Sequence, residues 1–124
     1  MNIKTIKNLF IVAALYDLIL GVLFLAAFKQ IYAFFNIALP NHDGYVQFAA
    51  CLVAIFGIAF WFVAQDPVRN RDIIKLGILL KLSYCSVAFY HNAMGNLPSI
   101  WLPFAWFDLI FLVLFVMAIR SLKS

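Results

Sequence analysis

Charged side chains are scarce in this sequence. They make up 11% of its 124 residues, whereas hydrophobic residues make up 67% and the mean hydropathy is +1.03. Soluble domains contain about 25% charged and about 45–50% apolar residues. The composition therefore excludes an ordinary soluble domain and indicates a membrane protein.

Motifs for catalysis are also missing. No nucleophile elbow, phosphate loop, H-E-x-x-H or haem motif occurs. A reaction cannot be argued from these residues, so we expect no catalytic residues, although catalysis is not excluded. We also expect no cofactor, while a quinone or a lipid would suit the composition.

Cysteine and histidine are too few to define a site. Cys51 and Cys85 are equally far from the centre of the 65–72 connector, so they should share one height and could form a disulfide, but without a C-x-x-C we expect small buried hydrophobes. His42, Asp43 and His91 should lie on one side of the membrane, yet they lack the spacing of a ligand set. We expect no metal site.

Long hydrophobic runs dominate what is present. A helix that crosses a hydrocarbon core of about 30 Å needs roughly 20 apolar residues. Four such blocks occur, at residues 9–28, 45–64, 73–90 and 100–118. The prediction is an all-α membrane protein, a four-helix antiparallel bundle forming one domain over residues 1–124. The basic start resembles a signal peptide, but Asp17 interrupts the first block, so we expect a retained helix.

The distribution of cations predicts the orientation. In a four-span arrangement, only Lys29 lies on one side, and the other side carries Lys4, Lys7, Arg69, Arg71, Lys75, Arg120 and Lys123. The positive-inside rule then places both termini in the cytoplasm. The cations are spread over three segments, so a nucleic-acid partner is not expected. The opposite side carries aromatic residues that we interpret as an interfacial belt in preference to a ligand cage: Tyr32, Phe34, Phe35, Tyr45, Tyr90, Trp101 and Trp106.

Three ionisable residues lie inside the blocks. At about 1.5 Å per residue, Asp17, Lys81 and Asp108 all fall about 12–15 Å from the cytoplasmic end, in one layer near the bilayer midplane. Apolar residues contribute roughly −4 kcal/mol to insertion of the third block, and a central lysine costs about +2.5 to +3.5 kcal/mol. Lys81 should therefore pair with both carboxyl groups, and one carboxyl group should hold a proton.

The neighbours of this network extend along the helix faces. Tyr16 and Tyr84 could add hydroxyl groups to it, although each is also an ordinary bundle tyrosine. Small and polar residues at helical spacing predict the inward faces. These faces are Phe10, Ala13, Ala14, Asp17, Gly21, Phe24 and Phe28; Gln47, Ala50, Cys51, Ala54, Gly57, Trp61 and Gln65; Ile74, Gly77, Lys81, Cys85, Ala88 and Asn92; and Trp101, Phe104, Ala105, Asp108, Phe111 and Phe115.

Several of these segments carry a family resemblance. The stretches "ALYDLILG", "AQDPVRNR", "LGILLKLSY" and "WFDLIFLVLF", with the total length, resemble the small bacterial four-helix membrane proteins called DoxX-like. The resemblance implies a membrane subunit or accessory protein, in some relatives associated with oxidoreductases and quinone chemistry. It transfers no catalytic residue. The small multidrug transporters are similar in size and have a carboxylate in the first helix, but Lys81 is foreign to them.

Three functions follow as expectations. The first is an accessory or structural subunit of a larger assembly in the bacterial inner membrane, with lipid and other membrane subunits or further copies of itself as partners. The second is a small proton-coupled transporter that uses Asp17, Lys81 and Asp108. The third is a quinone-binding or lipid-binding protein. A cavity that reaches the charged layer would favour the second and third.

Overall fold

Four helices account for nearly all of the described chain. The computed structural model describes residues 1–122 and contains α1 (Ile3–Phe34), α2 (Asp43–Gln65), α3 (Arg71–Ala93) and α4 (Trp101–Ser121), with no strand among these residues. All four are long and apolar enough to cross a membrane. The predicted all-helical class, with four helices long and apolar enough to span a membrane, is therefore confirmed.

The helices extend beyond the predicted hydrophobic blocks at every end except the start of α4, which begins one residue later than predicted. Caps and turns, not the last apolar residue, terminate the backbone hydrogen bonding. The side chain of Asn2 accepts from Thr5 N and starts α1 six residues before residue 9. At the far end, Ile37 N donates to Tyr32 O and Asn36 has a φ of 55°, which is a left-handed helix stop.

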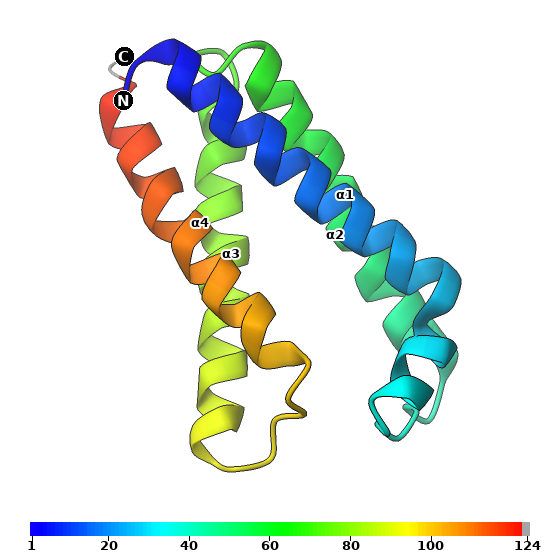
Figure 1. Ribbon diagram of the computed structural model, residues 1–124. Helices are drawn as coiled ribbons and strands as arrows, with labels where there is room; N and C mark the ends of the chain where they lie inside the picture. The colour runs from blue at the N-terminus through cyan, green and yellow to red at the C-terminus, as the bar shows by residue number, and fades with distance from the viewer. Residues whose placement is uncertain (123–124) are drawn as a thin grey trace.

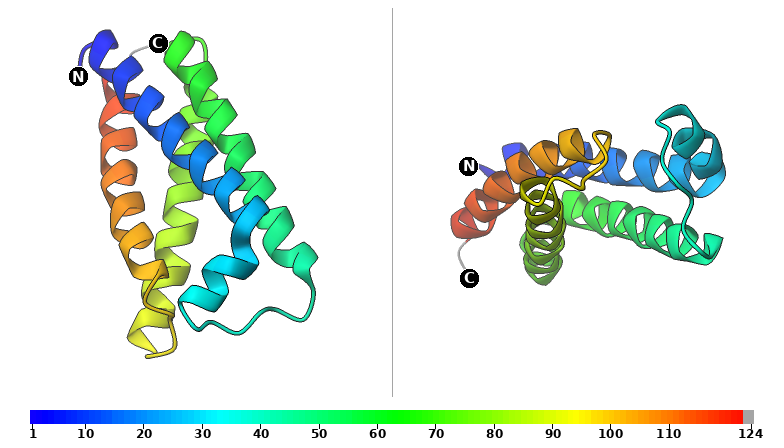
Figure 2. Two further views of the ribbon diagram at one scale, coloured as in Figure 1. Left: turned by 45° about the vertical axis from the view of Figure 1, so that its right-hand side comes forward. Right: turned by 90° about the horizontal axis from the view of Figure 1, so that it is seen from below.

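The first helix is too long for a single straight span. Its 32 residues correspond to about 48 Å, against a hydrocarbon core of about 30 Å. The backbone of Ala27 leaves the helical region, with φ −136° and ψ 22°, and the turns after it bend away from the rest of α1 (Figure 2, left, cyan). The sequence "KQIYAF" thus forms short helical turns at the end of the bundle, as its amphipathic pattern indicates.

The helices pack as two pairs. Helix α1 lies along α2 and α3 lies along α4; the pairs lie close together at the end that carries Met1 and separate toward the other end (Figures 1 and 2). Glycines permit the close approach of α1 to α2. A Cβ at Gly21 would lie 2.5 Å from Ala54 N, and one at Gly57 would lie 2.6 Å from Leu18 N.

A hydrophobic cluster joins the pairs where they meet. Phe10 from α1, Phe60 from α2 and Phe115 from α4 are fully buried, with ring centroids 4.5–5.8 Å apart. Ile74 and Gly77 bring α3 against the same rings. We call this cluster the aromatic plug, because it fills the space between the helices on the Met1 side of the charged layer.

The predicted inward faces are correct for α1 and nearly so for α3 and α4. Every predicted α1 residue is buried, and on α3 only Asn92 is wrong, because it is exposed in the last turn. The α2 prediction is partly wrong: Gln47, Trp61 and Gln65 are exposed. Burial of Phe60 in the plug turns the adjacent Trp61 outward, and Val63 and Ala64 continue the buried face.

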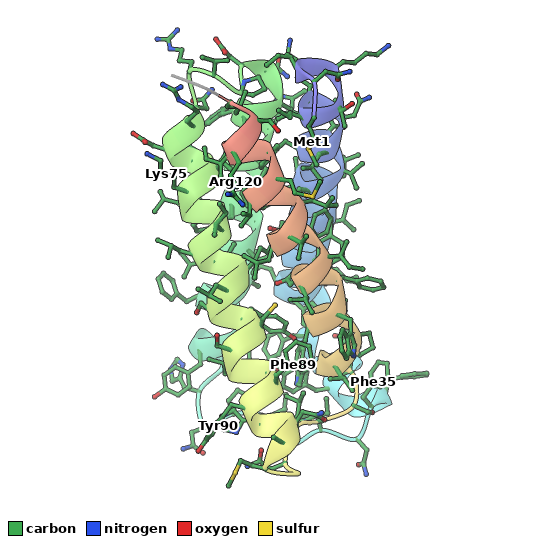
Figure 3. The ribbon with its side chains drawn as sticks, turned by 90° about the vertical axis from the view of Figure 1, so that its left-hand side faces the viewer. Met1, Phe35, Lys75, Phe89, Tyr90 and Arg120 are labelled. Carbon is green, nitrogen blue, oxygen red and sulfur yellow. The ribbon has the colours of Figure 1, made fainter. Side chains whose placement is uncertain are left out.

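Charge separates the two ends of the molecule. Met1, Lys75 and Arg120 lie toward one end, and Phe35 and Tyr90 lie toward the other (Figure 3). The terminal amine also donates to Ser121 Oγ at 3.2 Å, which places the two ends of the described chain together. Lys123, which contributes to the orientation prediction, lies outside the described residues.

The connector between α2 and α3 is tightly organised. Asn70 stands at the N-cap position of α3, but its side chain makes no capping hydrogen bond to that helix. Its Nδ2 instead donates to Phe62 O at 2.9 Å and to Asp66 O at 3.0 Å. Asn70 thus caps the end of the preceding helix and fixes the turn.

Candidate functional site

Three helices bring Asp17, Lys81 and Asp108 together. Each residue lies on the buried face of its helix, with 2%, 1% and 8% of its surface exposed, respectively. The carboxyl groups approach Lys81 from α1 and α4, which belong to different helix pairs. The predicted contact between these residues is present, and it links the two pairs through side chains.

The geometry around the ammonium group is asymmetric. Lys81 Nζ lies 3.0 and 3.1 Å from the two oxygens of Asp17 and 3.0 Å from Asp108 Oδ1. These three acceptors match the three N–H donors of a lysine. Among the described residues no donor reaches Asp108 Oδ2, and the Asp108 side chain keeps 11% of its surface accessible, against 3% for Asp17.

Aromatic rings complete the surroundings of Lys81. Its Nζ lies 5.4 Å from the ring centroid of Tyr16, 5.8 Å from that of Phe60 and 5.2 Å from that of Phe111. These distances are within the range of cation–π attraction. The lysine is thus held by two carboxyl groups and by π faces, with Phe60 as the link to the aromatic plug.

The two neighbouring tyrosines do not extend the hydrogen-bond network. Tyr84 donates its hydroxyl to Trp101 O at 2.9 Å and so joins α3 to the start of α4. Tyr16 contacts Lys81 through its ring, while its buried hydroxyl has no hydrogen-bond partner among the described residues. The sequence correctly placed Tyr16 and Tyr84 beside the charged residues. It did not show that Tyr16 presents its ring to Lys81 or that the Tyr84 hydroxyl bonds Trp101 O instead.

A cavity of about 390 Å³ ends at this charged layer. All four helices line it, with Asp17, Lys81 and Asp108 at its floor. Its volume lies in the lower part of the range of about 300–1,000 Å³ that is typical of small-molecule sites. We call it the central cavity; its aromatic lining consists of Tyr16, Phe24, Tyr32, Tyr45, Tyr84, Trp101 and Phe104.

Some of the predicted belt residues belong to this cavity. Phe34, Tyr45, Tyr90 and Trp106 are exposed, as an interfacial belt requires. Trp101 instead turns inward, with its ring centroid 5.3 Å from that of Phe24 and 6.1 Å from that of Tyr32. The interpretation as a belt is therefore wrong for Trp101, whereas its predicted place on the inward face of the fourth helix is correct.

The cysteines and histidines have separate local roles. Cys51 and Cys85 are free thiols, and buried Cys85 donates to Ala105 O at 3.5 Å. His42 Nδ1 accepts from Gly44 N at the start of α2, and His91 Nδ1 lies 3.1 Å from Asn96 Oδ1. Within residues 1–122 no group of three His, Cys, Asp or Glu side chains is arranged to hold a metal ion.

One ion pair joins the ends of α1 and α2 on the aromatic side. Lys29 Nζ lies 3.2 Å from Asp43 Oδ2, and both side chains are largely exposed. Asp43 therefore has a partner other than the two histidines. Asp43 thus also compensates the charge of Lys29, the single lysine that the sequence places on this side.

Comparisons with known proteins add no identity. No protein-family model, curated protein sequence or solved structure matches this chain. The resemblance to DoxX-like proteins therefore stays a prediction, and the geometry of the site is the basis for proposing a function.

Proposed function

We propose that this chain is a multi-pass protein of the bacterial inner membrane that binds an amphipathic molecule, a lipid or a quinone, in the central cavity. The observation that supports the proposal is the continuity between an apolar, aromatic cavity and the buried charges at its floor. Pockets of this kind hold an apolar body by burial and orient it by a few polar groups. A cavity that stopped short of Lys81 would have left the charges with a purely structural role.

The separation of the helix pairs makes room for such a molecule. The aromatic plug fills the bundle on the Met1 side. The helix pairs separate toward the opposite end (Figure 1). A ligand can thus place its polar group near Asp108 and its apolar part between the pairs. The half-buried side chains of Leu20, Val46 and Val53 provide apolar contact there.

Filling the cavity tests this proposal. Ala49 lines the cavity and is exposed, so Ala49→Phe would occupy its edge without burying a polar group. Ala26→Phe is the matched control, because Ala26 is also an exposed helical alanine but lies outside the cavity. Each protein would be purified in mild detergent, extracted with organic solvent and analysed by mass spectrometry for bound lipids and quinones.

The expected result is a molecule that co-purifies stoichiometrically with the wild type and with Ala26→Phe and is depleted from Ala49→Phe. Equal recovery from all three proteins would mean that the extracted molecules are bulk lipid. The proposed function would then be wrong.

The proposed topology is an antiparallel bundle with both termini in the cytoplasm. The cations of the end that carries Met1, including Lys75 and Arg120, support this orientation under the positive-inside rule. Reporter fusions at residue 122 and within the 94–100 connector test it. A reporter that functions only in the cytoplasm should be active at residue 122, and one that functions only in the periplasm should be active within the 94–100 connector. The opposite pattern would show that the orientation is reversed.

Transport is a second candidate, favoured by the position of Lys81 between the central cavity and the aromatic plug. Carriers expose such a midplane site alternately to each side. Reconstituted vesicles should then show proton or substrate flux that is lost in Asp17→Asn and Lys81→Met. Flux no greater than in empty vesicles would leave binding without transport.

A role as an accessory subunit is compatible with ligand binding and is favoured by the short connectors. The segments between the helices cover only residues 35–42, 66–70 and 94–100, which leave little polar mass for an independent activity. Mild purification should then recover a defined membrane partner. A stable, ligand-bound monomer with no partner would contradict this role and leave the binding proposal intact.

A further inference from the structure

From the charges and the walls of the central cavity we infer that its ligand is a single-chain amphiphile with a protonated amine head, which enters from the lipid between α2 and α3. This inference rests on the proposed binding function and narrows it to one chemical class. Three observations carry it: an excess acidic charge, an unoccupied carboxylate oxygen and an aromatic wall that is open on one side.

The floor of the central cavity contains two carboxyl groups but only one cation, the ammonium group of Lys81, among the described residues. Asp17 uses both oxygens on Lys81, whereas Asp108 uses only Oδ1. No other lysine or arginine lines the cavity within the described chain. In a low-dielectric site an uncompensated carboxylate must take up a proton or acquire a cation. An amine head supplies that cation and replaces the proton that one carboxyl group is expected to hold when the cavity is empty.

The atom available to a ligand is an acceptor. Lys81 has no donor left to offer, because three carboxylate oxygens surround its three N–H groups. Asp108 Oδ2 has no partner among the described residues, and Asp108 lines the cavity. A head group with N–H donors can therefore bind Oδ2. An anionic head would be repelled by the excess carboxylate charge, and the donor offered to it there, without a partner among the described residues, is the buried hydroxyl of Tyr16.

The walls suit the same charge. The rings of Tyr16, Tyr84 and Phe104 line the cavity together with the floor residues. A cation near the face of an aromatic ring is stabilised by the ring quadrupole, and more so when it is shielded from water. Aromatic walls above an acidic floor thus favour an organic cation over a neutral or anionic head.

The route by which a ligand enters the central cavity follows from the contacts between neighbouring helices of different pairs. On the α1–α4 side, Phe24 contacts both Trp101 and Phe104, and Tyr16 contacts Phe107, with ring centroids 5.3–6.3 Å apart. In the same half of the molecule, no aromatic pair or hydrogen bond joins α2 to α3 among the described residues. The α2 lining residues Tyr45 and Ala49 are exposed, so the cavity opens at their side.

Tryptophan fluorescence can test this inference with the intact chain. The sequence has three tryptophans; Trp101 lines the cavity, and Trp61 and Trp106 are exposed on the helix surface. Replacing Trp61 and Trp106 by Phe leaves a cavity reporter. Replacing Trp61 and Trp101 by Phe leaves Trp106 as the matched reporter of ligand in the surrounding lipid.

Both reporter proteins would be titrated in lipid nanodiscs with three dodecyl amphiphiles that carry the same bromine on the chain. The head groups are a primary amine, an alcohol and a sulfonate. Bromine quenches a tryptophan that it contacts, so stronger quenching of Trp101 than of Trp106 measures occupancy of the cavity. The amine should reach half-quenching of Trp101 at roughly one tenth of the sulfonate concentration or less, as one lost charge interaction predicts.

The outcomes separate the two proposals. If the sulfonate or the alcohol binds as well as the amine, the amine assignment is overturned while the binding function stands. If no amphiphile quenches Trp101 more than Trp106, both are overturned. The variant Asp108→Asn keeps the Lys81–Asp17 pair and removes the excess charge, so it should abolish the preference for the amine; a preserved preference would also overturn the assignment. The titrations of the two reporter proteins that retain Asp108 decide the question even if that variant does not fold.

Discussion

Removing the buried lysine provides the sharpest test of the charged layer. The variant Lys81→Met replaces the ammonium by an apolar chain of similar length and leaves Asp17 and Asp108 without their shared partner. A joint variant in which Lys81→Met is combined with Asp17→Leu and Asp108→Leu removes all three polar groups. Because Lys81 donates to both carboxyl groups, as the sequence predicts, Asp17 is replaced together with Asp108.

The two variants should differ in stability by several kcal/mol. Breaking a buried ion pair by removing one partner costs about 3–5 kcal/mol, because the remaining charge stays buried. Replacing a whole buried network by apolar residues is often neutral or stabilising by about 1–4 kcal/mol. The single variant should therefore be less stable than the joint variant, although it changes fewer residues. Lys81→Ala should behave like Lys81→Met, with a further loss of packing.

The assay is equilibrium unfolding by sodium dodecyl sulfate in mixed micelles, with expression as a second measure. Lys75→Met is the matched control on the same helix. Lys75 pairs with Asp72 at 3.3 Å, but both side chains are exposed, so its loss should change stability by less than about 1 kcal/mol. A Lys81→Met protein as stable as the wild type, or a joint variant no more stable than the single one, would contradict the expected cost of burying carboxyl groups without a cation.

Three further substitutions test the packing in the same assay. Gly57→Ala should lose about 1–3 kcal/mol, because its Cβ would lie 2.6 Å from Leu18 N and force α1 and α2 apart; unchanged stability would show that the helices can shift freely. Phe60→Ala should lose about 3–5 kcal/mol by opening the aromatic plug, whereas Phe62→Ala on the exposed face serves as its control. Asn70→Ala should lose about 0.5–1.5 kcal/mol with the two bonds that end α2, and a loss near zero would assign the turn to Pro67 and the backbone.

Hydrophobic periodicity was sufficient to predict the charged layer. The heights of Asp17, Lys81 and Asp108 follow from a constant rise per residue, and a lone lysine in an apolar block must find a carboxyl group. The inward face of α1 was predicted for the same reason, since its small and polar residues recur at helical spacing. On α2 this signal was ambiguous, because Phe60 and Trp61 are adjacent and either one can be buried.

The cavity could not be predicted, because it depends on the angle between two helix pairs. Gly21 and Gly57 indicate a close contact but do not name the helix that makes it. Helical spacing places Trp101 on the inward face of its helix but does not show that it lines a cavity, and no local pattern shows that Asp108 keeps one oxygen free. These features arise from the way α1–α2 and α3–α4 meet at the aromatic plug.

Four apolar helices long enough to span a membrane, and a buried lysine with two acidic partners, follow from the amino-acid sequence. Helix length and the cost of an isolated charge are local properties, so they can be computed along the chain. The tertiary structure alone decided which oxygen remains open, which rings line the cavity and which side of the bundle is open. Those properties depend on the relative placement of residues from different helices, and that placement is set by side-chain packing between them.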